Sequence, residues 1–248
     1  VWSMCFFYAL SVTAQTLENR YQLKEGFDWE VVAGPWTPRY YVSGFEFPKM
    51  PVLTNEAPNR LQFLTWGLVP FWVKTPEQAA QIRGKTLNAR AETVLEKPAF
   101  RQAVQRRRCL VPADGFYEWR AVGGKKYPYY IFLKDRTVFS FAGIWEEWAD
   151  PATGELIRTY SILTTEANPL LAKIHNTKKR MPVILPRKRE RAWLSAGLCM
   201  NELLSFLQPF PAAQMEAYTI GRLITARAAN RNCPEVQAPF VYRELGEG

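Results

Sequence analysis

Histidine is almost absent from this sequence, since His175 is the only one in 248 residues. Cysteine is also scarce, and no two of the four cysteines form a C-x-x-C pair. Zinc sites in proteins usually take their ligands from closely spaced Cys and His pairs, so we expect neither a metal site nor a cofactor. The four thiols are Cys5, Cys109, Cys199 and Cys233.

Long apolar segments are missing as well. No run approaches the roughly 18–20 apolar residues that a membrane-spanning helix needs, so we expect no membrane partner. The first residues lack the basic and apolar regions of a signal peptide. Widely spaced cysteines without an export signal are typical of reduced thiols, and the expected location is therefore the cytoplasm.

The residues that are present favour a loop-rich and strand-rich globular protein. Hydrophobic residues make up 48% of the chain and aromatic residues 14%, with 18 prolines and 14 glycines. This composition suits a large core and argues against a helical bundle. We predict an α+β fold: a single domain with a mostly antiparallel, barrel-like sheet core and peripheral helices.

The charge balance is basic. The chain has 32 Lys and Arg against 23 Asp and Glu, which gives a formal net charge of +9. Such a balance favours polyanionic partners, although many basic proteins bind no nucleic acid. Compact clusters of cations occur at residues 106–108, 178–180 and 187–189. The last cluster is followed by Glu190, which is more typical of a solvated helix start.

Strand signals outnumber helix signals along the chain. Helices are expected at 13–23, 75–82, 91–96, 98–105, 168–172, 186–194 and 201–207, with Thr13 and Thr75 as caps and Pro76 at a first helical position. Strands are expected at 40–42, 51–54, 62–69, 109–112, 115–120, 127–133, 138–145, 160–165 and 181–185. Gly123-Gly124 predicts a hairpin turn. Because the strands are mostly sequential neighbours, we expect antiparallel pairing.

A cysteine directly follows Met4. If translation starts at Met4 and this residue is removed, Cys5 becomes N-terminal and carries an amine and a thiol on adjacent carbons. An aldehyde can react with both groups, first as a Schiff base and then as a five-membered thiazolidine ring. Residues 1–3 precede this pair and are interpreted as a leader, a cloning remnant or a misassigned start. A Met-Cys pair alone is weak evidence, because most such cysteines occur by chance.

A second segment, residues 86–93, carries alternating polar side chains. Asn88, Arg90 and Glu92 would project from one face if the segment is extended. Asn88 offers both a donor and an acceptor, and Arg90 offers a fork that matches a phosphate. The alternative is an ordinary helix N-terminus with caps.

A third segment, residues 111–119, places a carboxylate in an aromatic strand. Glu118 stands between Tyr117 and Trp119. Partial desolvation there would raise its pKa and make it a usable acid or base near neutral pH. The alternative is an edge-strand glutamate that points to solvent.

A fourth segment, residues 174–185, contains His175 in a polar, basic loop before an apolar strand. The unperturbed pKa of histidine suits proton transfer near neutral pH. A lone histidine is nevertheless more often structural than catalytic.

Together and in this order, these motifs make the sequence resemble the SOS response-associated peptidase family, whose members crosslink to abasic sites in single-stranded DNA. The resemblance covers nearly the whole chain, with a single domain expected at residues 4–240. Each motif is only moderately specific, whereas the ordered set is highly specific. The motifs are Met4-Cys5, Trp66 to Trp72, Asn88 to Thr93, Pro112 to Trp119, and His175 with Arg180-Met181-Pro182.

The resemblance implies a role for each matching residue. Cys5 matches the nucleophile that forms the thiazolidine, and Asn88 the residue that positions the reacting end. Glu118 matches the acid or base of the Schiff-base chemistry, and His175 the group that promotes opening of the sugar ring. For DNA binding, Arg90 and Arg180 match phosphate contacts, and Trp72 matches an aromatic residue where the base stack is interrupted.

Three departures from the family pattern concern the surroundings of the site. The family usually reads Cys-Gly-Arg at its start, whereas this chain reads Cys5-Phe6-Phe7, so the bulky Phe6 needs room. The loop from His175 to Arg180 is longer than the common pattern. Residues 41–44 replace an Asn-x-x-Pro type of sequence. These differences indicate a subfamily with the same chemistry.

The resemblance thus implies a monomer that shields abasic sites in single-stranded DNA, associated with the nucleoid when it is bound to DNA, and that exposes Cys5 by peptidase self-processing. The rival hypotheses are a conventional cysteine peptidase that uses Cys5, His175 and Glu118, a non-covalent single-strand binding module, and a lyase that cleaves at abasic sites.

Overall fold

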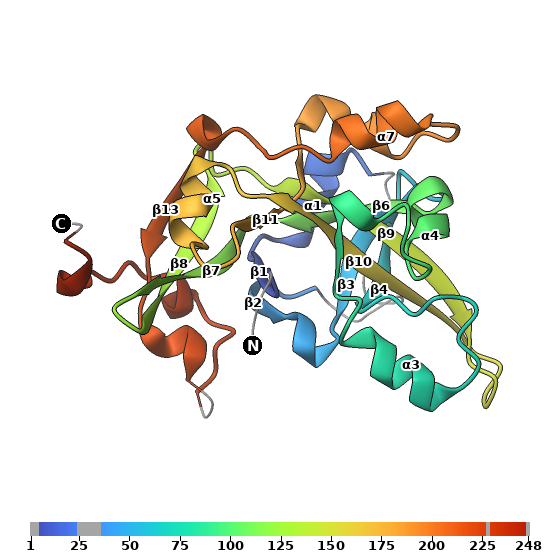
Figure 1. Cartoon of the computed structure of the whole chain (residues 1–248), viewed down its shortest axis with the longest axis horizontal. Helices are drawn as coiled ribbons and strands as arrows, with labels where there is room; N and C mark the ends of the chain where they lie inside the picture. The colour runs from blue at the N-terminus through green and yellow to red at the C-terminus, as the bar shows by residue number, and fades with distance from the viewer. Residues whose placement is uncertain (1–4, 24–35, 227–228, 247–248) are drawn as a thin grey trace.

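The computed structural model of the protein describes residues 5–23, 36–226 and 229–246. Met4 and the segment 1–3 lie outside the described residues. Two sheets form most of the described fold, and Figure 1 shows them side by side, with β1 and β2 on the side of the first sheet that faces the second. None of the described helices is long and apolar enough to cross a bilayer.

The first sheet has five strands in the order β13-β8-β7-β1-β2. All of its pairs are antiparallel. Its strands are β1 (Phe7–Leu10), β2 (Arg39–Ser43), β7 (Gly115–Val122), β8 (Lys125–Leu133) and β13 (Met215–Thr219). The predicted hairpin turn at Gly123-Gly124 joins β7 to β8, with positive φ at both glycines.

The second sheet closes into a five-stranded barrel. The path runs β10-β4-β3-β6-β9, and β9 then pairs with β10 again. The β4–β10 pair is parallel and the other four pairs are antiparallel. The predicted α+β fold with a mostly antiparallel, barrel-like core is therefore confirmed. The barrel strands are β3 (Lys49–Thr54), β4 (Leu61–Trp66), β6 (Arg108–Ala113), β9 (Phe139–Ala149) and β10 (Leu156–Glu166).

Three short strands extend this sheet at the ends of β9 and β10. β5 (Asn88–Arg90) and β11 (Arg180–Pro182) pair with β10, and β12 (Ile184–Leu185) pairs with β9. The single strand expected at 181–185 is thus divided at Val183. The backbone of Val183 still bonds to both neighbours, because its N–H donates to Leu163 and its carbonyl accepts from Ala142.

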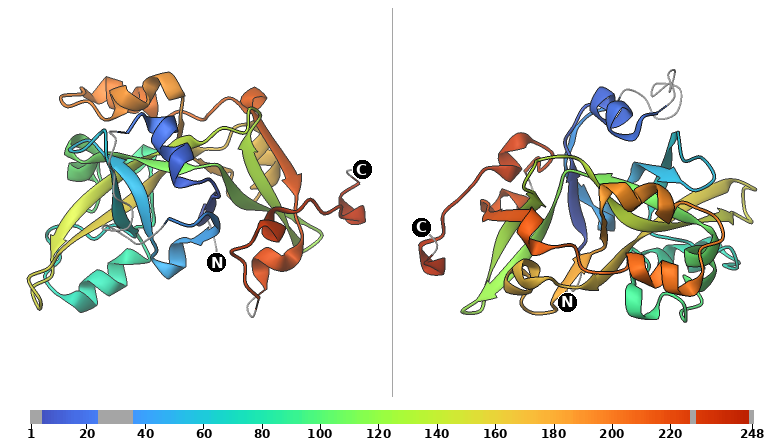
Figure 2. Two further views of the ribbon diagram at one scale, coloured as in Figure 1. Left: turned by 180° about the vertical axis from the view of Figure 1, so that it is seen from behind. Right: turned by 90° about the horizontal axis from the view of Figure 1, so that it is seen from above.

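The described helices are short and lie around the sheets (Figures 1 and 2). They are α1 (Ala14–Tyr21), α3 (Pro76–Arg83), α4 (Arg101–Arg106), α5 (Pro169–Ile174), α6 (Glu190–Trp193) and α7 (Met200–Phe206). Thr13 and Thr75 cap α1 and α3 as predicted, each accepting a bond from a backbone N–H. The helix expected at 91–96 is only a 3-10 turn, η2 (Ala91–Thr93).

Three buried aromatic residues join the two sheets. Trp66 of β4 stacks on Tyr160 of β10 with ring centroids 6.2 Å apart, and Tyr8 of β1 packs against Trp66 at 5.2 Å. The hydroxyls of Tyr8 and Tyr160 are 3.1 Å apart, which satisfies two polar groups inside the core. β1 is therefore fixed to the barrel as well as to its own sheet.

One test of barrel packing is Gly143→Ala. Gly143 lies on β9 between β6 and β10, and an added Cβ would stand 2.6 Å from the Cys109 sulfur and 2.9 Å from a Val111 methyl. We expect a loss of about 1–3 kcal/mol in the free energy of unfolding, measured by urea denaturation. Gly84→Ala is the matched control, because its Cβ meets nothing within 4 Å. Equal losses in both variants would contradict this account.

Candidate active site

Cys5 lies at the entrance to β1 and is almost fully buried, with 4% of its surface exposed. β1 is an inner strand between β2 and β7, and the carbonyl of Phe6 accepts a bond from the Gly44 N–H at 2.9 Å. The residue that sequence analysis identified as the nucleophile is thus held by a strand that is hydrogen-bonded on both sides.

Asn88 begins β5 and contacts Cys5 directly. β5 pairs in parallel with β10, which places Asn88 opposite Ile162. The Asn88 side-chain amide donates to the Cys5 carbonyl at 3.1 Å. Its Oδ1 is buried and has no hydrogen-bond partner among the described residues. The segment is therefore extended at 88–90, and the alternative of a helix start applies only from Ala91.

Glu118 reaches the same place from β7. β7 is paired with β8 on one side and β1 on the other, so the alternative of a solvent-facing edge residue is wrong. Glu118 is 4% exposed, and its carboxyl bonds to the Cys5 thiol. Burial raises the pKa of Glu118, and the nearby His175 offsets part of this increase. Raising the pKa of a carboxyl favours its neutral form as an acid.

The surroundings of the Cys5 thiol also favour its neutral form. Burial raises the pKa of the thiol well above its ordinary value, and the charge of Glu118 raises it further. Arg180 acts in the opposite direction and lowers this pKa, but its effect is smaller. The thiol is thus a group that keeps its proton until a base removes it.

His175 ends α5 with its ring directed at Glu118. Its Nδ1 is 3.0 Å from the backbone carbonyl of Arg180, so Nδ1 carries the proton when the ring is neutral. Its Nε2 is 3.9 Å from Oε2 of Glu118, which is beyond hydrogen-bond length. The ring therefore presents Nε2 to the site.

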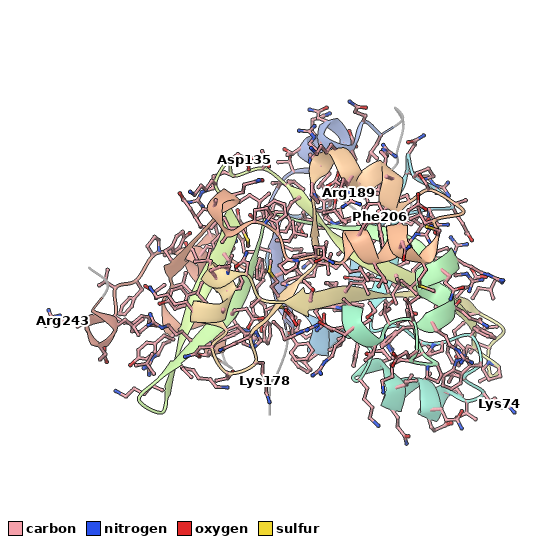
Figure 3. All side chains as sticks on the ribbon, turned by 45° about the horizontal axis from the view of Figure 1, so that its top comes forward. Lys74, Asp135, Lys178, Arg189, Phe206 and Arg243 are labelled. Atoms are coloured by element: carbon pink, nitrogen blue, oxygen red, sulfur yellow. The ribbon has the colours of Figure 1, made fainter. Side chains whose placement is uncertain are left out.

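The longer loop after His175 is a compact turn. The His175 carbonyl accepts bonds from Lys178 and Lys179, and Lys179 adopts a left-handed conformation with φ of 51°. Figure 3 labels Lys178 on this loop. Asn176, which sequence analysis missed, binds the loop to β7. Its amide donates to the Ala121 carbonyl at 2.8 Å and accepts from the Ala121 N–H at 3.0 Å.

Arg180 is held by partners within the protein. Its guanidinium makes a two-pronged bond to the Glu92 carboxylate, with the second contact at 2.9 Å, and donates to the Thr164 carbonyl at 2.8 Å. Burial is the largest single influence and raises the pKa of Glu92, but the bonds from Arg180, a backbone bond and the charges of Arg180 and Arg90 together lower the net pKa. Sequence analysis did not predict this pairing of Glu92 with Arg180.

The two other predicted DNA contacts lie on the surface. Arg90 is exposed at the end of β5, close enough to Glu92 to lower the pKa of its carboxyl. Trp72 is 44% exposed and Phe71 is 50% exposed on the loop between β4 and α3. Within the described ranges, no hydrogen bond or ion pair joins Arg90 or Trp72 to Cys5, Asn88, Glu118 or His175.

The structure therefore brings together Cys5, Asn88, Glu118 and His175 from four distant segments. In the described part of the chain, no group of three His, Cys, Asp or Glu side chains could hold a metal ion. The four residues offer a thiol, an amide, a carboxyl and an imidazole, which suits nucleophilic chemistry with proton transfer.

Glu118→Gln tests whether ionisation of the buried Glu118 carboxyl lowers the stability of the folded protein. Because its pKa is higher in the folded than in the unfolded chain, the folded protein binds the extra proton, and stability falls as pH rises from the ordinary carboxyl value through the raised one. Glutamine stays neutral, so the variant should gain stability relative to the original protein as pH rises from 4 to 8. Urea denaturation at several pH values measures this, and a difference that is independent of pH would contradict it.

The sequence is similar to known proteins over most of its length. Residues 4–226 match the family model described as SOS response associated peptidase (SRAP). The abasic site processing protein YoqW of Bacillus subtilis is 40% identical over 208 residues, which is 82% of this chain and 87% of that protein. The abasic site processing protein HMCES of Gallus gallus is 35% identical over 75% of this chain and 58% of its own length.

Solved structures give the same answer for the fold. A crystal structure of a protein from Bacteroides thetaiotaomicron has a TM-score of 0.89 and 40% identity, covering 96% of this chain and all of that one. A second, from Bordetella bronchiseptica, has a TM-score of 0.71 and 28% identity, covering 88% of this chain and all of that one. From the matched family model and these relatives, the chain belongs to the SOS response associated peptidase family.

Proposed function

We propose that this protein processes abasic sites in single-stranded DNA through a covalent thiazolidine link to Cys5, formed after the residues before Cys5 have been removed. The observation that carries the proposal is the buried contact between the Cys5 thiol and the Glu118 carboxyl, with His175 Nε2 at 3.9 Å from that carboxyl. The relatives from Bacillus subtilis and Gallus gallus, which are named as abasic site processing proteins, support the choice of substrate.

The proposed reaction begins at the amine. An α-amino group has a pKa of about 7.7–8.0, so a large fraction is neutral near pH 8 and can attack C1 of the ring-opened sugar. The amine forms a C–N bond, and the carbinolamine then loses its hydroxyl as water to give an imine. Attack of the thiol sulfur on C1 closes the ring. In total, aldehyde, amine and thiol give a thiazolidine and one water.

Glu118 and His175 supply the proton transfers for these steps. A neutral Glu118 can give its proton to the departing hydroxyl, and the resulting carboxylate can take the proton of the adjacent thiol. This order agrees with a thiol whose pKa is raised, because the thiol then reacts after the amine. His175 presents Nε2, which we assign to the proton of the opening sugar ring.

Asn88 and the cations position the substrate in this proposal. Asn88 holds the Cys5 carbonyl, and its unpartnered Oδ1 can accept a bond from the amine or the sugar. Arg90 and Arg180 would contact phosphates, and Trp72 would stack on a base next to the lesion. To bind phosphate, Arg180 must exchange part of its contact with Glu92.

Self-processing would use the same cysteine. The Cys5 thiol attacks the Met4 carbonyl, which moves the acyl group from nitrogen to sulfur and frees the amine. Water then hydrolyses the thioester, so the leader leaves as an acid and the thiol returns.

Replacing Cys5 tests the covalent link. Protein that starts at Met4, with loss of that methionine confirmed by mass, should form an adduct with an abasic oligonucleotide that survives denaturing electrophoresis. Cys5→Ala should leave at most an imine that needs borohydride to trap it, whereas Cys199→Ala, at an exposed cysteine, should react normally. An adduct that forms equally in Cys5→Ala would refute the thiazolidine. Salt-sensitive binding without an adduct would favour the non-covalent module, and strand cleavage without an adduct would favour a lyase.

Replacing the proton-transfer groups tests the mechanism. We expect Glu118→Gln and His175→Gln to slow adduct formation by about 100- to 10,000-fold, the usual range for general acid-base catalysis. Rates are compared at saturating protein, so that a change in DNA binding does not enter them. Glu216→Gln, at an exposed position of β13, is the control. Quenched-flow sampling followed by gel analysis gives the rates, and a rate in Glu118→Gln equal to the control rate would count against its role.

A further inference from the structure

A cavity of about 420 Å³ adjoins the active site on the side of the five-stranded sheet. Glu118 and His175 form part of its wall. Most of the other lining residues are aromatic or cationic, and the remainder are Ala121, Thr177, Ile224 and Thr225. None of them has a part in the thiazolidine chemistry proposed above. The aromatic and cationic lining residues are Phe6, Phe7, Tyr41, Trp119, Lys126 and Arg231.

The aromatic wall is arranged around Phe7. The ring of Phe7 stacks on Tyr41 with centroids 5.6 Å apart and an interplanar angle of 27°. Trp119 meets Phe7 edge-on at 5.3 Å, and Phe6 packs on Phe45 at 4.7 Å. Phe6 and Phe7 stand where the family usually has Gly-Arg, so their part of the wall departs from the common pattern, whereas Trp119 belongs to a shared motif.

Two cations accompany the aromatic wall. The Arg231 guanidinium lies 4.4 Å from the centroid of the Tyr41 ring, bonds to the Tyr41 hydroxyl at 2.9 Å and pairs with Glu46 at 3.2 Å. Lys126 lies near enough to Glu118 to lower the pKa of its carboxyl. Aromatic surfaces combined with cations are the usual means of binding single-stranded nucleic acid.

A buried polar atom on the active-site side also lacks a partner. Oε1 of Glu118 is buried and, among the described residues, has no hydrogen-bond partner. A buried polar atom without a partner is costly in free energy, which favours a ligand that brings a donor or acceptor. A flat ring with polar edges meets these conditions, whereas a purely aliphatic group does not.

We propose that this cavity receives the nucleobase of a nucleotide adjacent to the abasic residue, with its phosphate toward Lys126 and Arg231. The inference rests on the proposed function: Glu118 contacts the Cys5 thiol and also lines the cavity, so a strand whose abasic residue is at Cys5 would bring a neighbouring nucleotide to the cavity. The volume and the stacked rings suit one base, and the net charge of +9 favours a polyanion over a peptide.

The test compares oligonucleotides that lack one neighbouring base. A tetrahydrofuran residue has no base and no aldehyde, so it can replace the nucleotide on the 5′ or the 3′ side of the reactive abasic site. We expect at least one of these two replacements to slow adduct formation by about 5- to 150-fold, as the loss of one stacked base would. Because Trp72 is also assigned to a base next to the lesion, the Tyr41→Leu variant below separates the cavity from Trp72. No effect of either replacement would overturn the proposal.

Protein variants connect the effect to the cavity. For each protein we compare the rate of adduct formation with the neighbouring base present and with that base absent. In Tyr41→Leu the ratio of these two rates should fall toward one. A general loss of activity slows both reactions equally and does not change the ratio. Phe240→Leu, a 50% exposed aromatic residue outside the cavity lining, should keep the full ratio. If Tyr41→Leu does not fold, Lys126→Gln is measured instead. The plot of the logarithm of the DNA-binding constant against the logarithm of salt concentration should become shallower by the amount expected for about one phosphate contact. A ratio that persists in Tyr41→Leu, or an unchanged salt dependence in Lys126→Gln, would overturn the proposal.

A fluorescent base separates this inference from the thiazolidine chemistry. In an unreactive oligonucleotide with a central tetrahydrofuran, 2-aminopurine placed beside it should be quenched by stacking in the original protein and less so in Tyr41→Leu. This result would support the cavity even if no covalent adduct ever formed. If 2-aminopurine is quenched on neither side of the tetrahydrofuran, the proposal is wrong. If the peptide Val-Trp-Ser-Met also displaces the oligonucleotide from the protein, the occupant of the cavity is a peptide.

Discussion

The pairing of β10 with four other strands is the constraint on which the site depends. β10 closes the barrel against β9 and β4, and its last residues carry β5 and β11. Asn88 of β5 lies opposite Ile162, and Arg180 of β11 lies opposite Glu166, so both residues are held at the same end of β10. A shift of one residue in either pairing would turn these side chains to the other face of the sheet. The closed barrel holds β10 between β9 and β4, whereas β5 and β11 each pair with β10 alone among the described strands, so their register depends on that one pairing.

The second requirement is that the five-stranded sheet stays fixed to the barrel, since Cys5 and Glu118 belong to one sheet and Asn88 to the other. The buried contact of Tyr8 with Trp66 and Tyr160 provides this connection three residues after Cys5. Asn176 provides another, because it binds the loop after His175 to the backbone of β7. The four chemical groups are thus held by the contacts between the two sheets, and loss of these contacts would displace all four groups together.

Much of this arrangement could be predicted from local sequence. The caps at Thr13 and Thr75 and the turn at Gly123-Gly124 depend on neighbouring residues alone, and the structure has all three. β1 gave no such signal, because a four-residue apolar strand inside a sheet shows no alternation of polar and apolar residues. The parallel pairing of β4 with β10 also has no local signature, since it joins segments about ninety residues apart. The meeting of Cys5, Asn88, Glu118 and His175 was implied by the resemblance to a family, whereas the Glu92 partner of Arg180 and the aromatic cavity depend on tertiary contacts.

The place of Cys5 beside an inner strand has a consequence for reactivity. Chain ends usually fray, and a reactive group on a mobile end spends little time in any one orientation. Here a single residue, Phe6, separates Cys5 from β1, a strand with partners on both sides. An amine at this position would lose little rotational freedom on meeting its target, so its effective concentration toward a bound aldehyde would be that of an interior side chain. If Cys5 is N-terminal as proposed, its amine would therefore be held as rigidly as a side chain in the interior of the fold.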